Sequence, residues 1–236
     1  MEEKVIIQPK VRLYRPSIYD IIAITGASGS GKGEVAKKII AAVGEEYVGH
    51  NELDNFYLDR SDMPPEEREK LDFDDPNNSL DWFEVIHFVM CLKEGKPVEM
   101  PLYDFDSHTR VTRPEPLIIT PKRFNLIDSH MALWHPKLRT LYRKKLFVDP
   151  TLDICGFRRQ DRDTRPKEEG GRGRTNESVR KQWPKVSRAF KIHFEPTKEF
   201  ANIIIPEGGN NEEGIDFIIG WMKYQIMIEA QQTQTA

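Results

Sequence analysis

The sequence has few cysteines and no long apolar run. Cys91 and Cys155 are its only two cysteines among 236 residues, and because they form no C-x-x-C pair, neither a disulfide framework nor a cysteine metal site is indicated. We expect both to pack inside apolar helices. No apolar stretch approaches the roughly 18 residues of a membrane span, and the N-terminal segment lacks the order of a secretory signal. We therefore expect a cytoplasmic protein without a membrane partner.

An excess of charge of either sign is also missing. The chain has 35 Lys and Arg against 38 Asp and Glu, which gives a formal net charge of -3. A protein that binds polymeric nucleic acid usually carries a strongly basic face, so we expect no nucleic-acid partner. A content of 38% hydrophobic and 31% charged residues suits one large α/β domain with an ordinary buried core.

Apolar runs alternate with helical patterns along the chain, which predicts parallel βαβ units. One helix is expected over residues 32–43, and a second begins at Ser79 as its N-cap and ends at Gly95. The predicted fold is α/β, a five-stranded parallel sheet with flanking helices. The expected strands are residues 20–25, 47–53, 124–128, 145–149 and 202–206.

The remaining segments suggest how the chain is divided. Prolines break short extended pieces between residues 96 and 121, which predicts a β-hairpin excursion that forms one wall of a substrate pocket. Residues 166–174 are rich in glycine and charge, the composition of a mobile loop. We predict an N-terminal extension over 1–19, a single domain over 20–230 and a flexible tail over 231–236.

A glycine-rich segment, GASGSGK, lies between the first expected strand and the first expected helix. It matches the motif G-x-x-x-x-G-K, in which backbone N–H groups and a helix N-terminus hold phosphates and the lysine reaches the β and γ phosphates. The motif usually continues with a Ser or Thr that ligates Mg²⁺, but Gly33 has no hydroxyl, so we expect water in its place. The predicted phosphate-binding residues are Gly26, Ala27, Ser28, Gly29, Ser30, Gly31, Lys32, Gly33 and Glu34.

Four stretches resemble one known family in their order and wording. They are LDNFY at 53–57, FDDP at 73–76, LKEGKPVEMPLYDFDSHTR at 92–110 and EPTKEFANIIIPEGG at 195–209. From about Ile21 to about Met222 the chain is similar to the uridine-cytidine kinases, within the wider group that includes phosphoribulokinase. The resemblance implies a P-loop NTPase fold of the nucleoside monophosphate kinase-like type, with ATP and Mg²⁺ as cofactors. It also implies a homo-oligomer, a dimer or tetramer, although no stretch identifies an interface.

Asp54 is the predicted catalytic base. It follows the second expected strand, at the sheet edge where open α/β sheets bind ligands, and the resemblance implies that it accepts the proton of the sugar hydroxyl. Its alternative is a helix cap or turn residue, whereas Asp59 is expected to be solvated. Lys32 and Arg162 complete the predicted catalytic set.

The resemblance also implies a pocket for a small-molecule nucleoside. Tyr103 and His108 would contact the base, with Phe73 and Phe105 beside it, while Asp74 would accept hydrogen bonds from the ribose. The other predicted contacts are Arg159, Arg174 and Gln182 for the nucleoside, and Arg159 and Asn210 for the nucleotide. The remaining histidines, among them His50 and His130, lack metal-ligand spacing and are expected in packing or surface roles.

Residues 159–176 resemble the mobile lid of the family, whose arginines close over the triphosphate. Arginine suits this task because its planar fork stays charged and grips oxygens bidentately. The piece PKEEGG reads as an insertion of about six residues relative to the family, and it leaves the placement of Arg172 and Arg174 open. Arg158, Arg165 and Lys167 are expected on a solvated face.

The third expected core strand departs from the family pattern. Family members usually end it in an E-G-I segment whose glutamate helps to hold magnesium, whereas this chain has Asp128, Ser129 and His130. We predict Asp128 as the metal ligand, with water bridging the shorter side chain.

Three functions remain open from the sequence. The first is ATP-dependent phosphorylation of uridine or cytidine to the 5′-monophosphate. The second is a catalytically weak relative that binds nucleotide, which the altered metal shell at Gly33 and Asp128 favours. The third keeps the phosphotransfer but uses another acceptor, such as a sugar phosphate. The loop grips phosphates and not the base, so ATP and GTP both remain possible donors.

Overall fold

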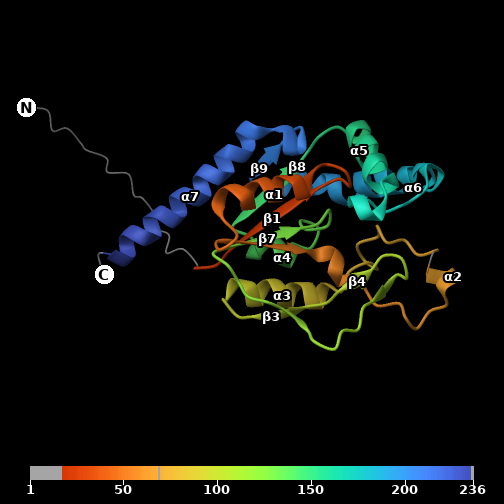
Figure 1. The fold of residues 1–236 in the computed structure, drawn as a ribbon, viewed down its shortest axis with the longest axis horizontal. Helices are drawn as coiled ribbons and strands as arrows, with labels where there is room; N and C mark the ends of the chain where they lie inside the picture. The colour runs from red at the N-terminus through yellow and green to blue at the C-terminus, as the bar shows by residue number, and fades with distance from the viewer. Residues whose placement is uncertain (1–17, 69, 235–236) are drawn as a thin grey trace, which may run out of the picture.

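Five parallel strands form the central sheet of the protein, which a computed structural model describes for residues 18–68 and 70–234 (Figure 1). Every residue is buried in two of these strands, residues 20–26 and 124–128. Helices on both faces explain why these strands read as continuous apolar runs. The predicted α/β class and five-stranded parallel sheet are confirmed. Across the sheet the order is β2 (Val48–Glu52), β7 (Phe124–Asp128), β1 (Asp20–Gly26), β8 (Lys144–Val148) and β9 (Ile203–Ile205).

Helices cover the two faces of the sheet (Figure 1). On one face, α1 (Lys32–Val43) and α7 (Glu212–Gln234) bury an apolar stripe that includes Val35, Ile39, Ile218 and Met222. On the other face, α3 (Trp82–Lys93) packs beside α4 (Pro136–Leu141). The helices α5 (Leu152–Thr164) and α6 (Asn176–Ala189) pack together at the end of the molecule near the glycine-rich loop.

Two short antiparallel pairs lie outside the central sheet. Strand β3 (Val98–Met100) pairs with β6 (Leu117–Ile119), and β4 (Tyr103–Asp104) pairs with β5 (Thr109–Arg110), which confirms the hairpin pairing predicted between residues 96 and 121. The shorter helical pieces are η1 (Leu53–Phe56), α2 (Pro65–Arg68), η2 (Lys167–Glu169), η3 (Phe190–Phe194), η4 (Glu195–Phe200) and η5 (Gly208–Asn210).

The predicted N-cap of α3 is wrong. The carboxylate of Asp81 accepts a hydrogen bond from the backbone N of Glu84 at 3.0 Å and thereby caps the helix. The hydroxyl of Ser79 instead donates to the carbonyl of Phe73 at 2.8 Å. Aspartate and serine are both good caps, and the hydrogen bonds of the preceding loop decide between them.

The end of the chain also differs from the prediction. Helix α7 continues through Gln234. Residues 231–234 are three glutamines and a threonine; glutamine is a good helix former, and no glycine or proline occurs among these four residues. Residues 231–234 of the predicted tail are therefore helical. Residues 235–236 lie outside the described residues, as do residues 1–17 of the predicted N-terminal extension. Within the described ranges, no helix combines the length and apolar character needed to cross a membrane.

Phe88 of α3 anchors the segment that carries Asp54. Its ring is 1% exposed and lies 5.0 Å, centroid to centroid, from the ring of Phe56 in η1. We predict that Phe88→Ala lowers the free energy of unfolding by about 3–5 kcal/mol, because it leaves a cavity in the core. Phe83→Ala on the same helix, where the ring is 83% exposed, is the control and should change it by less than about 0.5 kcal/mol. Equal losses in urea unfolding would contradict this packing.

Candidate active site

The carboxyl ends of three adjacent strands place the site. In the sheet Asp128 is paired with Glu52 on one side and with Ile24 on the other. Asp54 and His130 each lie two positions beyond this row, and the glycine-rich loop begins directly after Gly26, which lies two positions beyond Ile24. The three segments therefore leave the sheet side by side, at the edge where α/β proteins bind ligands.

The glycine-rich loop, residues 27–31, joins β1 to α1. Gly29 and Gly31 have φ angles of 84° and 95°, a left-handed backbone conformation that residues other than glycine rarely adopt. A Cβ atom at Gly29 would lie 2.2 Å from the carbonyl oxygen of Cys155 in α5. The close approach of α5 therefore depends on glycine at this position.

Lys32 opens α1 and folds back over the loop. Its Nζ donates to the carbonyls of Gly26 and Ala27, both at 3.1 Å. Burial lowers the pKa of Lys32, while the negative charges of Asp128 and Asp54 oppose this shift. The ammonium group thus lies among carboxylates at the start of the helix, where a phosphate would also be favoured.

A cavity of about 520 Å³ opens beside the loop and is called the phosphate cavity below. Gly26, Ala27 and Ser30, predicted to bind phosphate, are buried and do not line it. The other predicted loop residues do line it, as do the predicted Asp54, Asp128 and Arg162. Its lining residues are Ser28, Gly29, Gly31, Lys32, Gly33, Glu34, Lys37, Glu52, Asp54, Phe105, Asp128, Ser129, His130, Arg158, Arg162 and Arg172.

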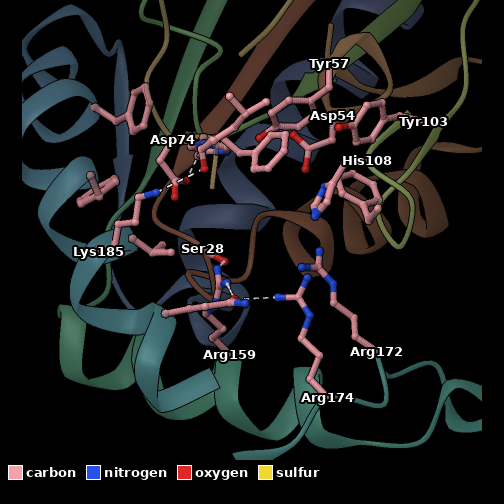
Figure 2. Close-up of a pocket in the computed structure, with 18 residues that line it drawn as sticks. Ser28, Asp54, Tyr57, Asp74, Tyr103, His108, Arg159, Arg172, Arg174 and Lys185 are labelled. Carbon is pink, nitrogen blue, oxygen red and sulfur yellow. Dashed lines mark hydrogen bonds and ion pairs between the residues drawn. The ribbon is translucent and has the colours of Figure 1, made fainter. Parts of the chain in front are cut away.

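A second cavity of about 320 Å³, the acceptor cavity, adjoins the first (Figure 2). Every residue predicted to contact the nucleoside lines it: Phe73, Asp74, Tyr103, Phe105, His108, Arg159, Arg174 and Gln182. Figure 2 shows Asp54, Tyr57, Tyr103 and His108 on one side, with Arg159, Arg172 and Arg174 opposite. Further lining residues that the sequence did not indicate include Tyr57, Leu71, Lys185, Val186, Phe190 and Phe194.

The two cavities share part of their walls. Both are lined by Ser28, Asp54, Phe105, His130 and Arg172. Asp54, the predicted base, therefore lies where the cavity beside the phosphate loop meets the acceptor cavity. Arg172 was not predicted as a site residue, although its position within G-R-G-R at the end of the charged loop was the signal available.

Aromatic rings form one wall of the acceptor cavity. The rings of Phe73 and His108 stack with their centroids 4.3 Å apart, and Tyr57 lies 5.2 Å from Tyr103 and 6.0 Å from Phe105. Burial raises the pKa of Tyr103 to about 12, so its phenol stays protonated and can donate a hydrogen bond. A wall of this kind offers a flat apolar face with polar atoms at its rim.

Two carboxylates of the acceptor cavity face polar side chains from the segment after β7. Oγ of Ser129 donates to Oδ1 of Asp54 at 3.4 Å, and Nε2 of His130 lies 3.7 Å from Oδ1 of Asp74. Burial lowers the pKa of His130, against the charges of Asp54 and Asp74. The packing or surface role predicted for His130 left out this placement, because its position directly after a central strand brings it into both cavities.

Asp163 of α5 gathers four arginines. Its side chain is fully buried, and its carboxylate oxygens lie 2.7 Å from Nη2 of Arg162, 3.5 Å from Nε of Arg159, 3.6 Å from Nη1 of Arg174 and 3.7 Å from Nε of Arg172. One carboxylate cannot balance four guanidinium groups, so positive charge remains beside both cavities. Such an excess favours the binding of a polyanion.

Arginines also join the lid region to the rest of the site. Nη1 of Arg159 donates to Oγ of Ser28 at 2.8 Å, and Nη1 of Arg174 donates to Oε1 of Gln182 at 2.9 Å. The solvated face predicted for Arg158 is wrong. Its guanidinium donates to the carbonyl of Ser30 at 3.4 Å and lines the phosphate cavity, because α5 packs directly on the loop.

The carboxylate of Asp128 forms a hydrogen bond with a histidine of the adjacent strand, His50 in β2. Nε2 of His50 lies 3.2 Å from Oδ2 of Asp128, so the packing or surface role predicted for His50 omitted its main contact. Burial alone would lower the pKa of His50, but the hydrogen bond and charge of Asp128 outweigh it and the pKa is raised. No group of three or more His, Cys, Asp or Glu in the described ranges is arranged to hold a metal.

Asn210 is the predicted nucleotide contact that the structure does not bring to the site. It is exposed in η5 and lines neither cavity. The neighbouring glycines make the close approach instead, since a Cβ at Gly208 would lie 2.1 Å from the carbonyl oxygen of Ser30.

Comparison with known proteins identifies a family from the sequence and a shared fold from solved structures. The model of the phosphoribulokinase/uridine kinase family matches residues 21–213. A uridine kinase from Yersinia pestis is 37% identical over 203 residues, covering 84% of this chain and 92% of its own. A putative fructose transport system kinase from Silicibacter shares the fold with a TM-score of 0.62 at 18% identity, over 82% of this chain and 92% of that one. The phosphoribulokinase from Rhodobacter spheroides shares the fold with a TM-score of 0.56 at 14% identity, over 81% of this chain and 71% of that one.

The arginine cluster makes a testable prediction about Asp163. Asp163→Asn should lower the free energy of unfolding by about 1–3 kcal/mol, less than for a fully buried pair because some of the arginines are partly exposed. Tripolyphosphate should then raise the melting temperature of this variant more than that of the wild type, because the arginines have lost their internal anion. Asp161→Asn, at an exposed position of the same helix, should behave as the wild type. Equal shifts for all three proteins would contradict the proposed balance of charge.

Proposed function

Because this chain belongs to the phosphoribulokinase/uridine kinase family and is a phosphotransferase with an alcohol acceptor, we propose that it phosphorylates uridine and cytidine at the 5′-hydroxyl. The phosphate donor in this proposal is ATP. One observation carries it: Asp54 lies on the wall shared by a cavity lined by the phosphate loop and a cavity lined by aromatic rings. A carboxylate in that position suits a general base between a triphosphate and a nucleoside.

The acceptor cavity supports a nucleoside as the substrate. A pyrimidine ring needs a flat apolar surface and polar atoms at its edge. The stacked pair Phe73 and His108 offers the surface, and Gln182, which lines the same cavity, offers polar atoms. The ribose would lie toward Asp74, whose carboxylate can accept hydrogen bonds from its vicinal hydroxyls. The relatives named uridine kinase support the same choice.

The reaction follows from the charges around Asp54. Asp54 accepts the proton of the 5′-hydroxyl as its oxygen attacks the γ-phosphorus, and the bond between that phosphorus and the ADP oxygen breaks. Lys32 and the arginines Arg162 and Arg172, which line the phosphate cavity, stabilise the charge on the transferring group. Residues 159–176 would act as the lid that holds water away from this step.

Asp128 is suited to hold Mg²⁺ with the triphosphate. Its carboxylate is a hard oxygen donor at the phosphate cavity, and Mg²⁺ in kinases commonly uses one or two carboxylates together with phosphate oxygens and water. The ion would neutralise negative charge on the phosphates. Gly33 adds no ligand, so water would complete the coordination.

A sugar phosphate is the second candidate acceptor. Basic side chains that suit a phosphate group also line the acceptor cavity: Arg159, Arg172, Arg174 and Lys185. The aromatic wall offers such a substrate little, so we place this candidate second. An assay with ATP, Mg²⁺ and a panel of uridine, cytidine, 2′-deoxyuridine, adenosine and ribulose 5-phosphate decides between them. Turnover with ribulose 5-phosphate alone would contradict the proposed function.

Asp54→Asn tests the base directly. We predict that kcat falls by about 10²- to 10⁴-fold, the usual contribution of a general base, while the affinity for ATP measured by calorimetry stays unchanged. Asp59→Asn is the matched control, because Asp59 is exposed and its carboxylate accepts hydrogen bonds from Ser61 and from the backbone N of Arg110 in β5. Loss of ATP binding together with turnover would show that Asp54 serves the loop and is not the base.

Gly33→Ser tests the metal shell. A Cβ atom at Gly33 meets nothing within 4 Å, so the serine fits, and its hydroxyl can supply the missing ligand. The Mg²⁺ concentration needed for half-maximal activity should fall. Gly33→Ala, which adds the same Cβ without the oxygen, should leave it at the wild-type value. A requirement in Gly33→Ser that is unchanged or higher would mean that other groups complete the shell.

A further inference from the structure

Two polar residues, Ser129 and His130, follow directly after Asp128 at the end of β7. The backbone N of Ser129 donates to the carbonyl of Ile24 at 3.2 Å, and Oγ1 of Thr25 donates to the carbonyl of His130 at 3.0 Å. Both contacts come from β1, so this step is fixed to the central sheet. Side chains that leave such a rigid element can hold other groups in place.

Each of these side chains faces one carboxylate of the acceptor cavity. Ser129 donates to Asp54 at 3.4 Å. His130 lies 3.7 Å from Asp74, and its Nε2 is buried and makes no hydrogen bond within the part of the chain that the structure describes. The separation is longer than a hydrogen bond, and a small movement of Asp74 toward the imidazole would complete one.

The imidazole of His130 is itself held in place. The ring of Phe194 meets it edge to face, with centroids 4.9 Å apart and an interplanar angle of 90°. The ring therefore keeps its orientation, and Asp74, in a loop between α2 and α3, is the partner that can adjust. A buried polar atom without a partner is costly, so closing this contact is favoured when a ligand fills the cavity.

We propose that Ser129 and His130 are positioning residues, Ser129 for Asp54 and His130 for Asp74. This inference rests on the proposed function, in which Asp54 meets the reacting hydroxyl and Asp74 meets the vicinal hydroxyls of the ribose. A misplaced catalytic group slows the reaction even when the substrate still binds. Ser129 therefore acts on kcat, and His130 acts on the KM for the ribonucleoside.

His130→Ile and Ser129→Ala remove the donors one at a time, and His130→Gln keeps a donor. His87→Ile, at an exposed position of α3, is the control.

Steady-state kinetics with uridine and with 2′,3′-dideoxyuridine measure the two effects separately. His130→Ile should raise the KM for uridine about tenfold, as expected when a hydrogen bond to a charged group is lost. It should leave kcat, the KM for ATP and the KM for dideoxyuridine unchanged, because dideoxyuridine has no vicinal hydroxyls. His130→Gln should restore much of the loss. Ser129→Ala should lower kcat about tenfold with an unchanged KM for uridine.

The outcomes separate this inference from the function on which it rests. Wild-type turnover of uridine with the same constants in His130→Ile and Ser129→Ala would overturn the positioning roles alone. Equal losses with both nucleosides, together with a lower melting temperature, would show a merely structural role and overturn them too. If the wild type phosphorylates only a sugar phosphate, the proposed function fails. The variants are then measured with that acceptor, and the positioning roles hold if Ser129→Ala lowers kcat and His130→Ile raises KM; unchanged constants would overturn them. No turnover with any acceptor would overturn both.

Discussion

The parallel register of β2, β7 and β1 is the constraint on which the site depends. Hydrogen bonding in the sheet aligns Asp128 with Glu52 and Ile24, so three segments leave the sheet at the same height. One becomes the phosphate loop, one carries Asp54, and one carries His130. A slip of one residue in any pair would turn the side chains of a strand to the other face and separate these groups. Helices packed on the sheet fix this register, because a slip would move buried apolar side chains out of the core. The packing of the core therefore also holds Asp54, His130 and the phosphate loop together.

Charge then divides this edge of the sheet into two parts. Lys32 lies near Asp54 and Asp128, and its lowered pKa reflects burial that these carboxylates only partly offset. Asp163 draws four arginines from both ends of the lid region into one cluster, which leaves positive charge beside both cavities. On the other side, aromatic rings lower the polarity of the acceptor cavity. We propose that a polyanion binds in the phosphate cavity and a flat neutral ring against the aromatic wall of the acceptor cavity, with Asp54 on the wall that the two cavities share.

Much of this arrangement was predictable from the sequence, because it depends on local signals. Apolar runs gave the five strands, and the glycine-rich motif gave the loop and α1 with its observed bounds. The misses have a different cause. Choosing Asp81 over Ser79 as a cap needs the hydrogen bonds of a loop, while the contacts of Arg158 and His50 join segments far apart in the chain. Their partners become visible only after the sheet and helices are assembled.

The position of the acceptor hydroxyl is the central claim, and a crystal structure with uridine and a non-hydrolysable ATP analogue measures it directly. We predict that the ring lies against Phe73 and His108 and that the 5′-oxygen lies within about 2.6–3.2 Å of a carboxylate oxygen of Asp54, in line with the terminal phosphorus. A 5′-oxygen outside hydrogen-bonding reach of Asp54, or a ring bound in another cleft, would contradict it.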